Sequence, residues 1–390
     1  MRVKLINTAN SMRLRDDALT WVLLLSIYLL GQFLASILLS LPWGPALGGD
    51  SSRYLDGVIE EGTVPYAGYI ALVWLAGLFG SPSVVIVIFQ SFLAIVAARA
   101  LLSVGTQLNS AAAGWISACW FLLFIEVVQW TRYILTESIF FSVTLILVFV
   151  AISPWKSEKY RIFFLIGISI LGSTLRPNGF ILIGAVVTFM LIKYQSKVRA
   201  IVGTTVTWSF LALSQVTIPW LSTGDTGSFE MRFLKGEVFW NQTDFQRVMP
   251  SSNGEIQSTT ELLLYILQHP IDSIALIFSR LGWELIQVRP WYSDFHNLYI
   301  IVFMIIFYVA AFVGWKKVRH SSLNLFVWCL TIPSMALIGA TWAIYEGRFA
   351  WWFLVAWMPW VGIGLKTIFD WGTSYFKGTN KREADVPTGS

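Results

Sequence analysis

The chain contains a series of apolar runs that are each long enough to cross a lipid bilayer as a helix. A membrane-spanning helix needs about 20 mostly apolar residues, and the run 20–42 already reaches that length. Hydrophobic residues make up 56% of the 390 residues, whereas charged residues make up 13%. Soluble domains carry about 25% charged residues. The sequence therefore predicts an all-α fold, a polytopic helical bundle embedded in a membrane.

The runs predict about ten transmembrane helices within a single transmembrane domain, residues 1–390. They cover 20–42, 83–103, 110–130, 134–153, 161–175, 178–194, 199–220, 298–315, 322–342 and 349–368. The first run follows a basic leader, residues 1–17, and is about twice as long as the apolar core of a signal peptide. We therefore expect it to be retained as the first span.

The basic residues predict the orientation of these spans, because cytoplasmic loops carry an excess of Lys and Arg. Five basic groups stand out, at residues 2–15, 156–161, 193–199, 316–319 and 377–382. Ten spans place all five groups on the cytoplasmic side, provided that the apolar segment 64–80 lies in the interface and does not cross. We expect a multi-pass protein of a bacterial inner membrane, with both termini in the cytoplasm.

Two segments between spans are expected on the periplasmic or extracellular side. The first outer loop, 43–82, should hold interfacial helices. The large outer loop, 221–297, begins polar and becomes amphipathic from Thr259, where apolar residues recur at helical spacing. His269-Pro270 interrupts this pattern and predicts two helices or a kink. The polar residues 376–390 are expected to be a disordered cytoplasmic tail.

Charged side chains at the outer ends of the predicted spans are the candidate functional residues, since charges near membrane depth usually mark a path or a reaction site. Asp50 and Arg53 follow the first run in the sequence Gly-Gly-Asp-Ser-Ser-Arg-Tyr. The others are Arg132, Glu137, Arg176, Glu346 and Arg348. Positive charge on the outer side runs against the positive-inside bias, so these arginines require anionic partners.

Two kinds of partner are open for the arginines. The first is a nearby acid in a purely structural ion pair: Asp50 with Arg53, Glu137 with Arg132, and Glu346 with Arg348. The second is a lipid phosphate, which guanidinium groups bind in a bidentate manner at any physiological pH. Arg176 has no acidic neighbour in the sequence, which favours a ligand there.

The second kind of partner predicts a reaction at the outer membrane interface, in which a lipid phosphate is the leaving group. Asp50 would take a proton from an incoming hydroxyl as general base, and arginines from separate spans would stabilise the developing phosphate charge. This chemistry requires Asp50 to share one hollow with Arg176 and Arg348. The sequence has no Gly-rich phosphate loop and no His–Cys cluster at metal spacing, so we expect no cofactor. The net charge of +5 comes from the basic loops and does not indicate nucleic-acid binding.

These residues resemble motifs of the GT-C glycosyltransferases that use polyprenyl-phosphate sugars, above all the branch with protein O-mannosyltransferases and the lipid A aminoarabinose transferase. Residues 50–54 are similar to the acidic motif in that family's first outer loop, and 64–66 to the start of its Pro-led interfacial helix. Residues 136–138, 176–177 and 346–349 resemble later motifs. The resemblance covers the spans within 1–220 and 298–370, whereas the large outer loop matches no motif that we can name.

The resemblance implies an inverting transfer of a hexosyl or pentosyl group from a polyprenyl-phosphate donor to an acceptor glycan, lipid or protein. Asp50 would be the base, Arg176 and Arg348 would hold the donor phosphate, and Arg53 and Glu137 would shape the site. Tyr54, Arg132 and Glu346 complete the set of substrate-binding candidates. Ser51 stands where the family often has an acid, so we expect no metal.

Two other classes of function use the same charged residues. A transporter or flippase of a lipid-linked or anionic substrate is the main alternative, although transporters tend to show internal repeats and charges at the membrane midplane. A structural assembly subunit, with ion pairs that only pack, is the other. A polymerase or ligase of surface polysaccharide is a near relative of the proposed transferase.

Several polar and aromatic residues have a structural interpretation that competes with a functional one. Glu126 and Gln129 are more simply explained by an interhelical hydrogen bond than by acceptor binding. Trp291 and Tyr292 are more simply explained by anchoring at the interface than by stacking on a sugar. His296 is isolated in the sequence, and we expect it to cap a helix or to be solvated.

Overall fold

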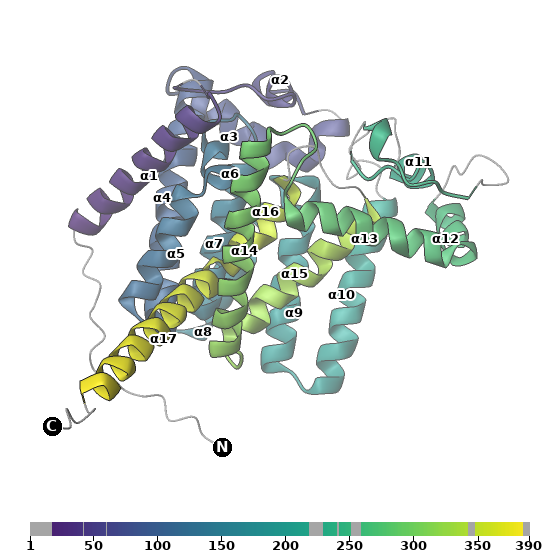
Figure 1. Ribbon diagram of the computed structural model, residues 1–390. Coiled ribbons are helices and arrows are strands. Elements are labelled where there is room, and N and C mark those ends of the chain that lie inside the picture. The colour runs from purple at the N-terminus through teal and green to yellow at the C-terminus, as the bar shows by residue number, and fades with distance from the viewer. Residues whose placement is uncertain are drawn as a thin grey trace.

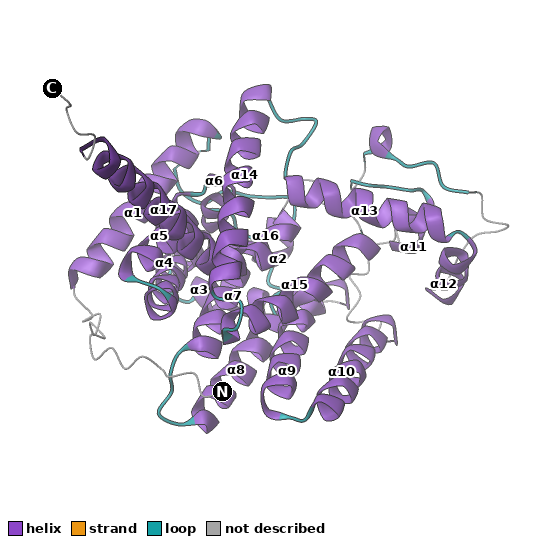
Figure 2. Cartoon of the chain, turned by 60° about the horizontal axis from the view of Figure 1, so that its bottom comes forward, coloured by secondary structure: helices purple, strands orange, loops and turns teal. Residues whose placement is uncertain are grey.

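The computed structural model describes residues 18–41, 43–59, 61–217, 229–239, 242–250, 259–341 and 348–384. All regular elements in these ranges are helices (Figure 2), and the only bridges between extended segments there join Ala46 to Tyr133 and Glu237 to Gln246. The all-α prediction is therefore confirmed. The basic leader 1–17 lies outside the described residues.

Six helices in the described residues are long and apolar enough to cross a membrane. They comprise α1 (Ala18–Leu38), α4 (Pro82–Leu108), η3 with α9 (Pro177–Tyr194), α14 (Asp294–Lys317), α15 (Ser322–Ala340) and the run Arg348–Ser374 formed by α16, η6 and α17. The count rises to seven if one bent pair is taken as a single span. The chain is thus a multi-pass membrane protein, but ten spans are not shown. The helices α7 (Glu137–Ile152) and α8 (Glu158–Ser173) have 16 residues each, just under the ~17 that a span needs.

The bent pair replaces the span expected over 110–130. Helix α5 (Ala111–Leu123) ends where Phe124 adopts an extended backbone, and α6 (Ile125–Val128) with η2 (Gln129–Thr131) continues at 63° to it. No Pro or Gly marks this break. The bend turns residues 125–131 away from the direction of α5, and it decides what these residues contact.

The first outer loop forms short helices at one end of the bundle, as Figure 1 shows for α2 (Ser51–Leu55) and α3 (Ala67–Gly77). The turn between α9 and α10 (Lys197–Thr217) and the turn between α14 and α15 lie at the opposite end. Those two turns carry the basic groups 193–199 and 316–319. The first outer loop and these basic groups therefore lie at opposite ends of the molecule.

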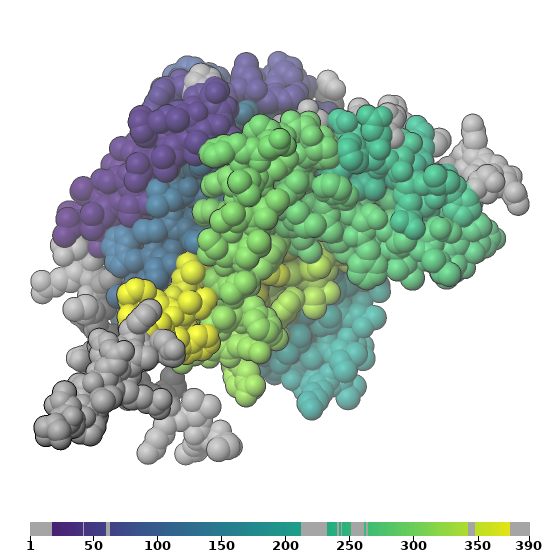
Figure 3. Space-filling view, viewed as in Figure 1, coloured from purple at the N-terminus to yellow at the C-terminus, as the bar shows by residue number. Residues whose placement is uncertain are grey.

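The large outer loop contains α11 (Phe229–Leu234), α12 (Thr259–Gln268) and α13 (Pro270–Ile286). The break between α12 and α13 falls at His269, so the structure has two helices where the sequence predicted two helices or a kink. Figure 3 shows this segment projecting from the side of the bundle. It is fastened there by Arg280, whose buried guanidinium donates to the carbonyl oxygens of Glu237, Gly339 and Ala340. Burial lowers the pKa of Arg280 to about 9.

The last helix differs from the prediction at its C-terminal end. Helix α17 (Met358–Ala384) continues through much of the tail 376–390, in place of the disorder expected there. Residues 385–390 lie outside the described residues. The helical start of this tail extends away from the end of the bundle that carries α2 (Figure 1).

Glycines allow α14 and α17 to pack with their backbones in contact. A Cβ on Gly364 would lie 1.8 Å from the carbonyl oxygen of Ala310, and one on Gly314 would lie 1.9 Å from that of Trp360. Small residues at helix contacts are usual in membranes, where close van der Waals packing replaces the hydrophobic drive. This contact positions α17, which belongs to the same run of helices that begins at Arg348.

We expect Gly364→Ala to destabilise the protein by about 1–3 kcal/mol, because an added methyl group in a close-packed contact forces the backbones apart. The measurement is the thermal unfolding midpoint of the detergent-purified protein. Gly372→Ala is the matched control on the same helix, since nothing lies within 4 Å of the added Cβ there. Equal midpoints for the two variants would contradict the packing argument.

Candidate functional site

Four charged side chains from separate segments form a continuous cluster at the end of the bundle that carries α2. Arg348, the first residue of α16 (Arg348–Leu354), places Nη2 3.6 Å from Asp50 Oδ2 and Nη1 3.4 Å from Glu137 Oε1. Arg176 Nη1 lies 3.2 Å from the same Glu137 oxygen. Arg53 extends the cluster at its edge, with Nη1 4.0 Å from Asp50 Oδ1. Charges of opposite sign therefore alternate from Arg53 to Arg176.

Asp50 is held in place because its loop is bound to the segment that leads into α7. The Ala46 amide donates to the Arg132 carbonyl (2.9 Å), and the Ile134 amide donates to the Ala46 carbonyl (3.1 Å). Ser51 accepts from the Gly48 amide and donates to the Ile134 carbonyl. Ser51 is buried, so these two hydrogen bonds fix the loop that carries Asp50.

Burial divides the cluster into an inner and an outer half. The side chains of Glu137 and Arg176 are only 3% and 5% exposed, whereas those of Asp50 and Arg348 are 36% and 23% exposed. The Arg176 guanidinium also lies over the rings of Phe349 and Phe140, at 5.1 and 5.8 Å from their centroids. The buried pair is costly to break, because removing one partner leaves an uncompensated charge. Glu137 also pairs with Arg348, so the inner pair holds this outer residue in position.

Tyr54 and Tyr66 form an aromatic wall beside Asp50 and Arg53. The Tyr54 ring is buried, with its centroid 5.5 Å from that of Tyr66 and 4.9 Å from that of Tyr69. Burial raises the pKa of the Tyr54 phenol well above its usual value, so this side chain stays neutral. Arg53 lies over the Tyr66 ring at 6.0 Å.

The structure corrects the pairing that the sequence suggested. Arg176 has no acidic neighbour in the sequence, but folding brings it to Glu137. The ion pairs of Glu137 described above come from Arg176 and Arg348, on separate segments, whereas Arg132 was the expected local partner. Arg132 is buried, donates to the side-chain and main-chain oxygens of Gln32, and lies 5.1 Å from the Trp43 ring. Its contacts thus support the fold beside the cluster. Glu346 lies outside the described residues.

Among the described residues, no three His, Cys, Asp or Glu side chains converge in an arrangement that would hold a metal ion. The cluster instead presents one half-exposed carboxylate beside two partly exposed guanidinium groups. Such a set can bind a phosphate through the arginines and accept a proton at the carboxylate.

No protein-family model and no curated protein matches the chain. Among solved structures it is similar to the archaeal oligosaccharyltransferase AglB from Archaeoglobus fulgidus in complex with an inhibitory peptide and a dolichol-phosphate, with a TM-score of 0.46 and 14% identity over 94% of this chain and 52% of that chain.

A second match is the Archaeoglobus fulgidus oligosaccharyltransferase in complex with Zn and sulfate, with a TM-score of 0.45 and 14% identity over 90% of this chain and 49% of that chain. The present chain thus spans about half the length of these solved chains. Likenesses this distant do not assign an activity to it.

Proposed function

We propose that this chain is a membrane glycosyltransferase that moves a sugar from a polyprenyl-phosphate donor to an acceptor hydroxyl. One observation carries the proposal. The Asp50 carboxylate, 36% exposed, lies 3.6 Å from the Arg348 guanidinium, which also contacts Glu137. A proton acceptor is therefore adjacent to a cation that binds phosphate. The residues of this cluster are also those that carry the resemblance to the GT-C motifs.

The reaction is a direct displacement at the anomeric carbon. The acceptor oxygen forms the new glycosidic bond, and its proton passes to Asp50 as general base. The bond between the anomeric carbon and the phosphate oxygen breaks, and that oxygen leaves with the bonding electron pair. Arg348 and Arg53 stabilise the charge that develops on the leaving phosphate. A single displacement inverts the configuration of the sugar.

The resemblance to the GT-C motifs assigned both Arg176 and Arg348 to the donor phosphate. In this proposal the two arginines have different roles. Arg348, 23% exposed, contacts the donor phosphate directly. Arg176, 5% exposed, holds Glu137, and Glu137 in turn orients Arg348. Arg176 and Glu137 are therefore positioning residues. Tyr54 and Arg132 act through the wall and the loop that hold Asp50, and a role for Glu346 stays a prediction.

We expect Arg348→Gln to weaken binding of a polyprenyl phosphate by about 10- to 100-fold, since a hydrogen bond to a charged group contributes ~1.5–3 kcal/mol. The measurement is the Kd of the detergent-purified protein for a short-chain polyprenyl phosphate without sugar, by titration calorimetry. Arg319→Gln is the control, because Arg319 belongs to the turn after α14, at the opposite end of the bundle. An unchanged Kd in Arg348→Gln would remove the phosphate contact from the proposal.

The proposed activity is tested with a labelled polyprenyl-phosphate sugar and the purified protein in lipid vesicles. Time-dependent release of polyprenyl phosphate, with loss of the sugar from the lipid, supports a transferase. Movement of the intact lipid from one leaflet to the other, without cleavage of the sugar–phosphate bond, would instead support the transporter alternative and reject the proposal.

We also propose that this reaction takes place on the outer face of a bacterial inner membrane, with both termini in the cytoplasm. The basic turns lie at the opposite end of the bundle from α2 (Figure 1), which supports this orientation because positive residues mark the cytoplasmic side. The partners would then be membrane lipids, the lipid-linked donor, and an acceptor glycan, lipid or protein on the outer side.

A further inference from the structure

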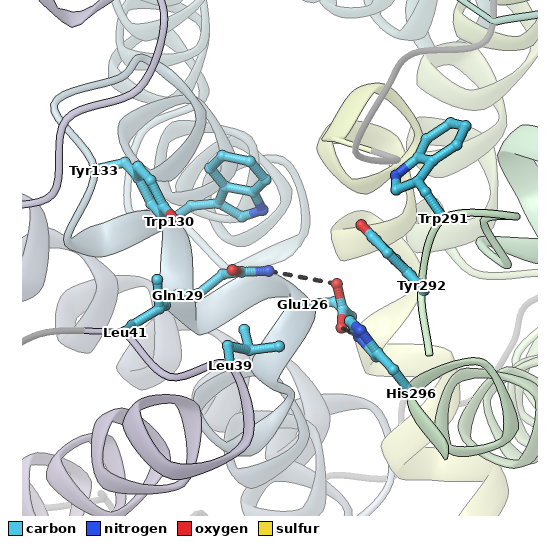
Figure 4. Close-up of a pocket in the computed structure, with 9 residues that line it drawn as sticks. All are labelled: Leu39, Leu41, Glu126, Gln129, Trp130, Tyr133, Trp291, Tyr292 and His296. Carbon is cyan, nitrogen blue, oxygen red and sulfur yellow. Dashed lines mark hydrogen bonds and ion pairs between the residues drawn. The ribbon is translucent and has the colours of Figure 1, made fainter. Parts of the chain in front are cut away.

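A second concave site lies beside the charged cluster, where the bent segment after Phe124 faces the start of α14 (Figure 4). It is a pocket of about 270 Å³. Its lining includes Trp130 and Tyr133 on one side and Trp291, Tyr292 and His296 on the other. From the sequence alone, Trp291, Tyr292 and His296 each had a separate structural explanation, and Trp130 and Tyr133 had no assigned role. The fold brings them together with Glu126 and Gln129.

The polar groups of the pocket are arranged around a buried carboxylate. Glu126 is buried, its Oε1 lies 2.7 Å from His296 Nε2, and Oε2 accepts from Gln129 Nε2 at 3.4 Å. Figure 4 shows the Trp130 indole nitrogen and the Tyr292 hydroxyl pointing toward one another across the pocket. The Trp130 N–H is buried and has no hydrogen-bond partner among the described residues. A buried donor without a partner costs free energy, and a bound ligand would satisfy it.

The pocket combines flat aromatic surfaces with groups that bind hydroxyls. The Tyr292 and His296 rings stack with centroids 4.3 Å apart, and Trp130 lies 5.3 Å from Tyr133. Aromatic faces suit the apolar face of a sugar ring, while the carboxylate, the amide and the indole N–H suit its hydroxyls. The volume is below the ~300–1,000 Å³ usual for drug-sized ligands, which favours a ligand part of about one sugar ring.

The pocket and the charged cluster are connected through the first outer loop. Tyr133, which lines the pocket, is bridged to Ala46, and Ala46 precedes Asp50 by four residues. An extended chain covers at most ~3.6 Å per residue, so Ala46 and Asp50 are within about 14 Å of each other. A saccharide bound in the pocket can therefore extend toward Asp50 with a further sugar residue.

We propose that this pocket is the acceptor subsite and that the acceptor is a saccharide. The inference rests on the proposed transfer, because it assigns the second substrate of that reaction. It also makes a claim that binding alone can test, since the pocket does not include Asp50.

The test is saturation-transfer NMR of the detergent-purified protein with methyl glycosides of glucose, galactose, mannose and N-acetylglucosamine and with the disaccharides cellobiose and chitobiose. We expect at least one of them to bind wild type and Asp50→Asn equally. Trp291→Ala should weaken that binding by about tenfold, as for an aromatic anchor. Trp130→Phe, which removes only the unpartnered N–H and part of the ring, should weaken it about two- to tenfold. Trp371→Ala, at an exposed residue of α17, is the control and should leave binding unchanged.

Each other result overturns the inference in a way that separates it from the proposed function. If no saccharide of the panel binds while the protein still releases polyprenyl phosphate, the pocket is not the acceptor subsite and the transferase proposal stands. If saccharides bind equally well to Trp291→Ala and Trp130→Phe, binding lies elsewhere. If a saccharide binds in the pocket but the donor is never cleaved, the transferase proposal fails and the acceptor role fails with it.

Discussion

Asp50→Asn should lower the rate of sugar transfer by about 10²- to 10⁴-fold, the range that a general base contributes. The substitution keeps the size of the side chain and removes the group that accepts the proton of the acceptor hydroxyl. Donor binding should persist, because Arg348 and Arg53 remain. The measurement is kcat for release of polyprenyl phosphate from a labelled donor in vesicles, together with the Kd for polyprenyl phosphate.

Asp56→Asn is the matched control for this prediction. Asp56 is an exposed acid at the C-terminal end of the same short helix, α2, so the same change is made six residues away. Its kcat should equal that of the unchanged protein. If Asp50→Asn retains more than about a tenth of the activity, another group takes the proton and the assignment of the base is wrong.

Glu284→Ala should lower the free energy of unfolding by about 3–5 kcal/mol, because it leaves the buried Arg289 without its carboxylate partner. Both Glu284 and Arg289 have fully buried side chains, and Arg289 Nη2 donates to Glu284 Oε2 at 3.1 Å. The other carboxylate oxygen accepts from the Ala350 amide at 2.7 Å. That amide lies in the first turn of α16, which begins with Arg348. The same substitution should therefore also weaken donor binding.

The measurement is the thermal or denaturant unfolding of the detergent-purified variant, with the Kd for polyprenyl phosphate as a second readout. Asp370→Ala is the control, since Asp370 is 54% exposed and its partner Lys366 is 26% exposed. Exposed pairs contribute ~0–1 kcal/mol. A loss of 1 kcal/mol or less in Glu284→Ala would show that neither the buried pair with Arg289 nor the link to the Ala350 amide contributes to stability as expected.

The candidate site shows how much the order of the charged motifs along the chain can predict. The sequence placed Asp50, Glu137, Arg176 and Arg348 at the same end of the predicted bundle, because each lies at the outer end of a span once the basic loops are assigned to the cytoplasm. The local pair of Asp50 with Arg53 was expected. The pair of Glu137 with Arg176 was not predictable, since these residues are 39 positions apart (176 − 137) and no local pattern encodes their 3.2 Å contact. Their catalytic and binding roles stay predictions.

The pocket shows where residue-by-residue interpretation fails. Glu126 and His296 are 170 positions apart, and each has a simple structural explanation when considered alone. The break at Phe124 turns Glu126 toward His296, and this break has no Pro or Gly to announce it. Backbone breaks of this kind depend on packing at both ends of the helix, which a single stretch of sequence does not contain.

The amino-acid sequence by itself determined the membrane setting, the helical class and the end of the bundle where charge gathers, because hydrophobic length and loop charge act locally along the chain. The tertiary structure alone decided which charges neutralise each other, where spans bend and which side chains enclose a pocket. These features depend on contacts between segments far apart in the chain, whose free energies are set by burial and distance after folding.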